Sequence, residues 1–310
     1  MLLAVLMLIA GGAVLLVGAE AAIRGATRFA VAVGVSAFVL GALLFGIDIE
    51  GLSAALLASS RGQSAIAAGE AFGTVVFLFG VGFGVALLIA KRPVPAPSVQ
   101  MILAPALPVA ACSLTVYDQY VSRAEGGLLI AMYAGYVLAV VAEGRALRAR
   151  SEELQKEAQE VRGGALRASV IGALGLLAVY GGAWLLVEGA VRILARTGLA
   201  GGFVGAALVG TLASLDEVLL ETIPIRRGSP ELATGNLFGT VAAFTTAVIG
   251  LAALIRPLLL DSAAAVALLA TAILYCLVAV VFLVRGSAWR VTGAVVLALY
   301  VAWLVYSATL

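Results

Sequence analysis

The sequence contains no histidine and only two cysteines among its 310 residues. Histidine is the commonest transition-metal ligand and the usual proton carrier near neutral pH, so histidine-based sites of both kinds are excluded. Cys112 and Cys276 lie in separate apolar runs. They are expected to be small core residues rather than a disulfide or a metal pair. Any ion chemistry must therefore use oxygen ligands, and no bound cofactor is expected.

Charge is also scarce. Asp, Glu, Lys and Arg make up 12% of the chain, while 63% is hydrophobic and the mean hydropathy is +1.15. A soluble domain carries about 25% charged residues, so too little polar surface remains here to cover a globule in water. The solvent must be lipid, in which helices satisfy their own backbone groups. The sequence predicts an all-α integral membrane protein that lies in the lipid bilayer and does not bind nucleic acid.

Apolar runs of about 20 residues, separated by charged breaks, predict ten transmembrane helices. The first run has no basic segment before it and no cleavage signal after it, so it is interpreted as a span rather than a signal peptide. The predicted spans cover residues 2–22, 29–58, 65–90, 98–117, 126–143, 167–189, 199–223, 231–255, 262–284 and 289–309.

The distribution of Lys and Arg predicts the orientation. Loops after the odd-numbered spans carry fourteen of these residues, whereas the termini and the loops after even-numbered spans carry five. Because basic loops stay in the cytoplasm, both termini are expected outside the cell membrane. The one clearly aqueous stretch, 143–166, is then a cytoplasmic linker. A plain solvated linker is favoured over a regulatory segment, and it separates a first five-helix repeat, 1–142, from a second, 167–310.

An internal repeat relates these two halves. Gly18, Gly25 and Arg28 recur 164 residues later as Gly182, Gly189 and Arg192. After a two-residue insertion, the segment Phe72-Gly73-Thr74-Val75 recurs at an offset of 166 as Phe238-Gly239-Thr240-Val241. An odd number of spans in each half means that the second copy enters from the opposite side of the membrane. Inverted repeats of this kind are a transporter architecture, with sites near the midplane where broken helices meet.

Several acids lie inside apolar runs without Lys or Arg in the same run. A carboxylate at the bilayer centre costs about 2.5–3.5 kcal/mol even on lenient insertion scales, so these groups must meet a cation, a proton or a donor. Glu20 and Glu188 differ, because Arg24 and Arg192 follow four residues later and predict helix-end ion pairs. The buried acids are Asp48, Glu50, Glu70, Asp216, Glu217 and Glu221.

The acids concentrate on the second and third predicted spans of each half. Asp48 and Glu50 lie between Gly46 and Gly51, where we expect an unwound helix whose carbonyls also become available to a cation. Glu217 and Glu221 are four residues apart and share a helix face.

On the third spans, Glu70 and Thr74 occupy the positions of Asn236 and Thr240, again four residues apart. Whether the threonine hydroxyls face an ion or bond to their own helix stays open.

These residues resemble the cation/calcium exchanger superfamily, whose repeats carry a G-T-S-x-P-E-like motif followed by a G-N-x-x-G-S-N-like motif. The second half reads G-T-L-A-S-L-D-E and then G-N-L-F-G-T-V. The resemblance implies ten spans in two inverted repeats. It also implies that Glu217 is the ion-binding glutamate, that Ser214 is its hydroxyl neighbour, and that Thr74 and Thr240 replace a serine.

The first motif departs from the pattern of the resembled family. Gly51 stands at the glutamate position, with Glu50 one residue earlier, and Asp48 replaces a serine. Further along, Asp216 replaces a proline and Glu70 replaces an asparagine of the motifs. Leu78 and Phe244 stand where the resembled family has site-facing polar residues.

The sequence thus predicts a secondary antiporter that exchanges a divalent cation, Ca²⁺ first, for Na⁺ or H⁺ by alternating access, with spans 1 and 6 rocking across the site. Exchange of Mg²⁺ or Mn²⁺, or coupling to protons alone, is the alternative. An intramembrane acid-dependent enzyme using Asp48 and Asp216, and an ion sensor that does not transport, are more distant ones. A monomer is compatible with the sequence. The predicted cation ligands are Asp48, Glu50, Glu70, Thr74, Ser214, Asp216, Glu217, Asn236 and Thr240.

Overall fold

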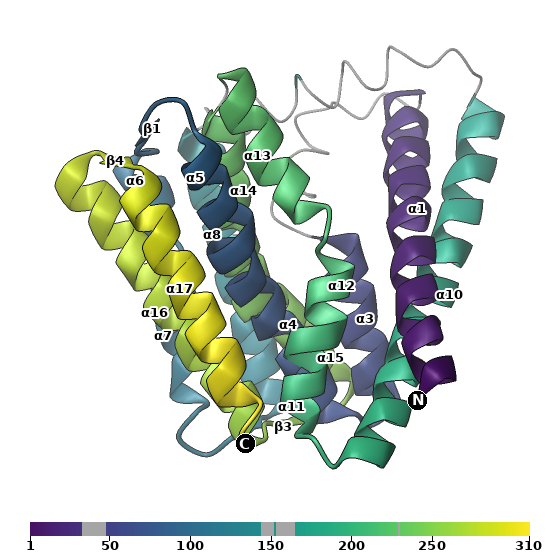
Figure 1. The fold of residues 1–310 in the computed structure, drawn as a ribbon. Coiled ribbons are helices and arrows are strands. Elements are labelled where there is room, and N and C mark those ends of the chain that lie inside the picture. Colours follow the sequence, from purple (N-terminus) through teal and green to yellow (C-terminus); the bar gives the residue numbers. More distant parts are fainter. Residues whose placement is uncertain (33–47, 144–151, 153–164, 229) are drawn as a thin grey trace.

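A computed structural model describes residues 1–32, 48–143, 152, 165–228 and 230–310, and shows a bundle of helices (Figure 1). The elements of the first half are α1 (Leu2–Ala32), α3 (Ile49–Ser60), α4 (Ser64–Phe77), the π-helical turn η1 (Leu78–Phe83), α5 (Gly84–Ile89), β1 (Val94–Pro95), α6 (Val99–Leu103), α7 (Ala106–Leu114), β2 (Tyr120–Val121) and α8 (Arg123–Glu143). Those of the second half are α10 (Ala165–Thr197), α11 (Gly201–Val204), η2 (Gly205–Gly210), α12 (Thr211–Ala213), α13 (Glu217–Arg227), α14 (Pro230–Ala243), η3 (Phe244–Val248), α15 (Ile249–Ile255), β3 (Leu258–Leu259), α16 (Ser262–Arg285), β4 (Ser287–Ala288) and α17 (Arg290–Ser307).

Seven helices in the described part of the chain are long and apolar enough to cross a membrane, and a bent pair raises the number to eight. The other two predicted spans correspond to shorter apolar helices, Ile49–Ser60 and Val99–Leu114, and the segment 33–47 lies outside the described residues. Both termini lie at the same end of the bundle, which requires an even number of crossings (Figure 1). The count of ten stays a prediction.

The first predicted span, 2–22, coincides with the apolar part of α1, whereas the predicted start of the second span at residue 29 falls inside this helix. α1 continues unbroken through Arg24 and Arg28 to Ala32. Its 31 residues cover about 46 Å at 1.5 Å per residue, against about 30 Å for the hydrocarbon core. The arginines therefore mark where the helix leaves the lipid, not where it ends.

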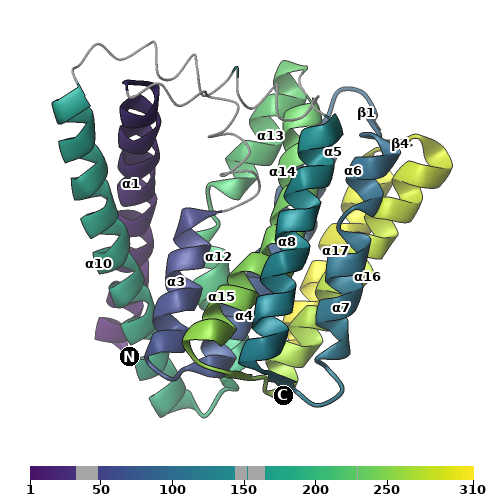
Figure 2. The same cartoon turned by 180° about the vertical axis from the view of Figure 1, so that it is seen from behind.

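α1 and α10 run antiparallel, side by side, at one edge of the bundle (Figures 1 and 2). A Cβ on Gly18 would lie 2.7 Å from Val179 N, and one on Gly182 would lie 2.6 Å from Leu15 N. Such backbone contact requires glycine, as is common between membrane helices. Leu15 and Val179 are 164 residues apart, as are Gly18 and Gly182, so exchanging the two halves converts one contact into the other.

Other features recur in both halves at nearly the same offsets. The π-helical turns η1 and η3 begin at Leu78 and Phe244, inside the two third spans. The short strands β1 and β4 pair, and so do β2 and β3. These strands were not predicted by the all-α interpretation. They form because backbone N–H and C=O groups in the connecting loops have no partner within a helix and hydrogen-bond to another loop instead.

The two third spans form the centre of the bundle. α4–η1–α5 and α14–η3–α15 are the most buried of the long spans. The outer helices instead expose large apolar side chains, as a surface in contact with lipid requires. Examples are Leu2, Leu174, Leu177, Val291 and Val305.

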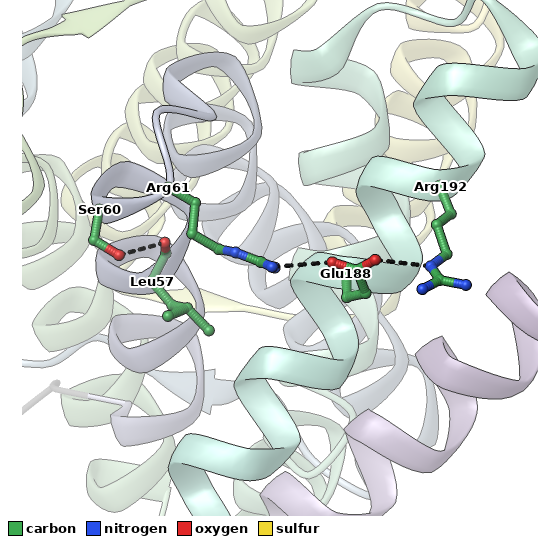
Figure 3. Close-up of polar contacts among 5 residues, drawn as sticks. All are labelled: Leu57, Ser60, Arg61, Glu188 and Arg192. Carbon is green, nitrogen blue, oxygen red and sulfur yellow. Dashed lines mark hydrogen bonds and ion pairs between the residues drawn. The ribbon is translucent and has the colours of Figure 1, made fainter.

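Both predicted helix-end ion pairs are present. Arg24 donates to Glu20 within α1, and the Arg192 Nε lies 2.8 Å from Glu188 Oε1 within α10. The structure adds Arg61, which follows α3 and approaches the other oxygen of Glu188 at 3.0 Å (Figure 3). Its guanidinium also lies 5.6 Å from the ring centroid of Trp184. These contacts connect α3 to α10.

Candidate cation site

The second predicted span of the second half is broken at its acidic residues. The axis bends by 48° between Gly201–Ala213 and Glu217–Arg226. Ser214 leaves helical geometry with φ −118° and ψ 23°, and the helix restarts after Asp216, whose carbonyl accepts from the backbone of Leu219 and Leu220. The broken span that the sequence predicts is confirmed for this half.

In the first half, α3 starts at the equivalent place and Asp48 caps it. Asp48 is extended, and its Oδ1 accepts from the backbone N–H of Glu50 at 2.7 Å and of Gly51 at 3.1 Å. An aspartate in this position satisfies donors that the first helical turn cannot pair internally. Its other oxygen, Oδ2, is buried without a hydrogen-bond partner. Asp48 therefore offers one oxygen to the site and uses the other to begin the helix.

Gly51 allows two carboxylates to approach each other. A Cβ at this position would lie 2.7 Å from Glu70 Oε1, 2.9 Å from Asp48 Oδ2 and 2.8 Å from Phe244 Cζ. No side chain fits there without displacing one of these groups. Gly51 departs from the family motif, and its lack of a side chain leaves the space in which the carboxylates of Asp48 and Glu70 approach each other.

Glycines also hold α4 against the second half. A Cβ on Gly69 would lie 2.2 Å from Gly202 O, and one on Gly73 would lie 2.3 Å from the Ala206 Cα.

The close approach of α4 and η2 brings the Thr74 hydroxyl within 3.0 Å of Ser214 Oγ, while Thr74 also donates to Glu70 Oε1 at 3.3 Å. Glu70 is fully buried, and its Oε2 has no partner. Asp48, Glu50, Glu70, Thr74 and Ser214 make up what we call the first cluster.

A second cluster forms around Asn236 on α14. Its Nδ2 donates to Glu217 Oε2 at 2.5 Å and to Glu221 Oε1 at 3.3 Å. Both glutamates are buried, as is Thr240 one turn further along α14, whose hydroxyl has no partner. Glu221 was not in the predicted ligand set. Its spacing of four residues from Glu217 was the signal that could have placed it there.

Eight of the nine predicted ligands therefore lie in two neighbouring clusters, and Asp216 lies at the break between Ser214 and Glu217. The clusters adjoin at the break in the second half, because Ser214 of the first cluster and Glu217 of the second are only three residues apart in the chain. Even so, no three acidic or cysteine side chains of the described residues gather in a single metal-binding group. The sequence favours one central site with Asp48, Glu50, Asp216 and Glu217 as its core, and this grouping stays a prediction.

The available atoms are oxygens, and several lack partners. In the described part of the chain, no Arg or Lys pairs with Asp48, Glu50, Glu70 or Glu221. A buried carboxylate without a cationic neighbour needs a bound cation or a proton, because its isolated charge is strongly unfavourable in apolar surroundings. The arrangement suits hard cations, which prefer carboxylate, hydroxyl and carbonyl oxygens.

Comparison with known proteins identifies the family. The family model described as sodium/calcium exchanger protein matches residues 3–142 and 168–309. The chain belongs to this family. It is accordingly a multi-pass membrane transporter of the cation/calcium antiport class and not an enzyme, which excludes the intramembrane acid-dependent enzyme considered above.

Two relatives and two solved structures extend the comparison. The chain is 26% identical over 278 residues to the "Putative antiporter CaxA" of Alkalimonas amylolytica, covering 86% of this chain and 85% of that protein. It is 24% identical over 286 residues to an uncharacterized membrane protein of Methanocaldococcus jannaschii, with coverages of 92% and 91%. The crystal structure of the H⁺/Ca²⁺ exchanger CAX superposes with a TM-score of 0.76 at 16% identity, over 97% of this chain and 82% of that one. A structure of the sodium-calcium exchanger NCX_Mj gives 0.64 at 23% identity and 98% coverage of each. These structural likenesses show a shared fold.

Proposed function

We propose that the protein exchanges Ca²⁺ for Na⁺ or H⁺ by alternating access through the two clusters. The observation that carries this proposal is a set of buried oxygens without hydrogen-bond partners at the start of α3, on α4 and at the restarted helix α13. They belong to Asp48, Glu70, Asp216 and Glu221. Buried oxygens of this kind require an external positive charge, and carboxylates favour a divalent one.

The counter-ion follows from the excess of acid. A divalent cation neutralises two carboxylates, whereas the apolar runs hold six acids. The remaining carboxylates need protons or Na⁺ at some stage of the cycle, because several adjacent buried charges of one sign repel each other strongly. Two coupling ions are thus compatible with the same donors.

The cell membrane is the proposed location, with both termini outside and the 143–166 linker in the cytoplasm, on the basic side of the chain. The proposed motion is a displacement of α1 and α10 across the clusters. Glycine contacts join these two helices to each other, and they stand apart from α16 and α17 at the opposite edge (Figures 1 and 2). A pair held together in this way can move as one body against the rest.

The direct test is ion flux in proteoliposomes that contain the purified full-length protein. We expect Ca²⁺ uptake that depends on an outward gradient of Na⁺ or H⁺ and stops when both gradients are collapsed. Sodium-free buffer with an imposed pH gradient distinguishes the two coupling ions. Absence of gradient-dependent flux for Ca²⁺, Mg²⁺ and Mn²⁺ alike would contradict the proposal, and it would favour a sensor that binds ions without moving them.

Exchange of Mg²⁺ or Mn²⁺, or coupling to protons alone, is the second candidate. It is favoured by Asp48 and Glu70, which place carboxylates where the resembled family motif has neutral side chains. Carboxylate oxygens bind Mg²⁺ and Mn²⁺ as well as Ca²⁺, so these two substitutions do not restrict the site to Ca²⁺. Competition by each divalent ion against labelled Ca²⁺ in the same vesicles would reveal the preferred substrate.

Glu188→Gln is expected to raise the exchange rate by up to about fivefold without changing ion affinity. Glu188 joins α10 to Arg61 after α3, so it stabilises the docked position of α10 (Figure 3). A partly exposed pair contributes about 0.2–1 kcal/mol, which corresponds to that range of rates when undocking limits exchange. The measurement is initial flux at saturating Ca²⁺.

The matched control for Glu188→Gln is Glu20→Gln. Glu20 pairs with Arg24 inside α1 only, so removing its charge leaves the contact between α3 and α10 intact. If Glu188→Gln lowers the exchange rate, or if both variants change it equally, Glu188 does not limit exchange by holding α10 against α3.

A further inference from the structure

Two buried apolar side chains, Phe244 and Leu78, lie where each third span passes the second-span helix of the other half. Each is the first residue of a π-helical turn, η3 or η1, and each is 0% exposed. η3 packs against α3, and η1 packs against α13. The two residues are 166 positions apart, which is the offset of the repeat. π-helical turns occur frequently at functional sites, so the equivalent placement of these two side chains needs a functional account.

Phe244 bounds the first cluster. The tip of its ring, Cζ, lies 2.8 Å from the point that a Cβ on Gly51 would occupy. Asp48 Oδ2 and Glu70 Oε1 lie 2.9 Å and 2.7 Å from the same point. The ring tip and the two carboxylate oxygens therefore surround one small space. Because an aromatic ring carries positive partial charge along its edge, this edge cannot serve as a ligand for a cation.

The two threonines that follow Phe244 do not replace the missing ligand. The Thr245 hydroxyl donates to Val241 O at 2.7 Å. The Thr246 hydroxyl donates to Ala242 O, again in the preceding turn of the same helix. Threonine commonly bonds to its own helix in this way. The side that η3 presents to the first cluster is therefore apolar.

Leu78 has the same relation to the second cluster. Gly82 lies in the same π-helical turn. A Cβ on that glycine would lie 3.3 Å from Leu78 Cδ1, 3.6 Å from Glu221 Cγ and 3.7 Å from Glu217 O. Leu78 thus packs beside the acidic segment of α13, as Phe244 packs beside the start of α3.

Buried apolar side chains in these positions exclude water from a bound ion. Ca²⁺ accepts about six to eight oxygen ligands at about 2.3–2.6 Å in flexible geometry, so protein oxygens alone can surround it. Mg²⁺ dehydrates reluctantly, keeps several waters, and requires octahedral geometry at about 2.0–2.1 Å. A site that offers neither water nor oxygen on one side therefore costs Mg²⁺ more than Ca²⁺.

We propose that Phe244 and Leu78 are specificity-determining residues, which favour Ca²⁺ over Mg²⁺ by excluding water from the shell of the bound ion. Neither side chain coordinates the ion, so each acts through the water that it keeps out. This inference rests on the proposed cation exchange, and it adds which divalent ion the exchanger selects.

The test is displacement of radiolabelled Ca²⁺ by Mg²⁺ from the purified full-length protein, with flux measured on the same preparations. Half-displacement from the wild type should require at least about 100-fold more Mg²⁺ than unlabelled Ca²⁺. Phe244→Asn supplies an oxygen and room for water, so this ratio should fall by at least about tenfold. Phe244→Leu removes a similar volume, but an apolar cavity stays dry, so its ratio should remain within about threefold of the wild-type value.

Leu251→Asn is the control for placing asparagine on the same span. Leu251 belongs to α15 and is 37% exposed, so its side chain lies on the outside of the bundle. This variant should keep the wild-type ratio of Mg²⁺ to Ca²⁺.

The outcomes separate this proposal from the exchange function. Equal displacement by Mg²⁺ and Ca²⁺ in the wild type overturns the selectivity role, even if Ca²⁺ exchange is robust. An unchanged ratio in Phe244→Asn, or an equal shift in Phe244→Leu or Leu251→Asn, also overturns it. Absence of gradient-driven flux in the wild type overturns the exchange function itself. If Phe244→Asn does not fold, the nearly isosteric Leu78→Asn decides the matter, and an unchanged ratio there contradicts the proposal.

Discussion

Glu217→Gln should reduce Ca²⁺ flux by at least about 100-fold. Glu217 belongs to the restarted helix α13, is buried, and accepts from Asn236. Glutamine has the same shape and can still accept that hydrogen bond, so packing is preserved while the charge is lost. Removing one partner of a buried ionic interaction costs about 3–5 kcal/mol, which is at least 100-fold in affinity. Flux of labelled Ca²⁺ at sub-saturating concentration measures the effect directly.

A control for Glu217→Gln must change an acid on the same helical hairpin without entering the cluster. Glu231→Gln fits, because this residue is exposed in the first turn of α14. It should transport at the wild-type rate. Wild-type flux in Glu217→Gln, with intact reconstitution, would remove α13 from the transport site.

Gly51→Ala should weaken Ca²⁺ binding by about 10- to 100-fold. The new Cβ would lie within 3.0 Å of oxygens on Glu70 and Asp48 and of the Phe244 ring. Overpacking of this kind typically costs about 1–3 kcal/mol, and here it acts directly on the two carboxylates of the first cluster. The measurement is the Ca²⁺ dissociation constant of the purified variant. Its thermal unfolding should be recorded in parallel, because a loss of binding from general unfolding would appear there.

Gly127→Ala is the matched substitution for Gly51→Ala. Gly127 is helical, in α8, and a Cβ there meets nothing within 4 Å. Alanine is the better helix former, so this variant should be at least as stable as the wild type and bind Ca²⁺ normally. Equal binding in Gly51→Ala and Gly127→Ala would show that the space at residue 51 is not required.

Composition determined the class of this protein and much of its site. A chain with few charges has no means of covering itself in water, so acids inside its apolar runs must serve an ion or a proton. The fixed repeat offsets matched Phe72-Gly73-Thr74 to Phe238-Gly239-Thr240, and the structure places a π-helical turn after both segments. The break near Ser214 and Asp216 was likewise evident from the polar run that interrupts an apolar span.

The sequence did not determine which carboxylate oxygens lack a hydrogen-bond partner in the folded protein. One oxygen of Asp48 is used to cap α3, and that depends on the extended backbone at this residue rather than on its identity. The contact between Glu188 and Arg61 joins residues 127 positions apart, so no local spacing could indicate it.

The division of the acids into two clusters was decided by tertiary structure alone. Sequence placed Asp48, Glu50, Asp216 and Glu217 at similar depths and favoured one central site with these acids as its core. The depth of a residue in the membrane follows from its position along its helix, which can be inferred from the sequence. Lateral separation is set by how closely α4 approaches α11 through Gly69 and η2 through Gly73, and by the side to which α13 bends after Ser214. These are properties of packed helices, and they exist only in the folded protein.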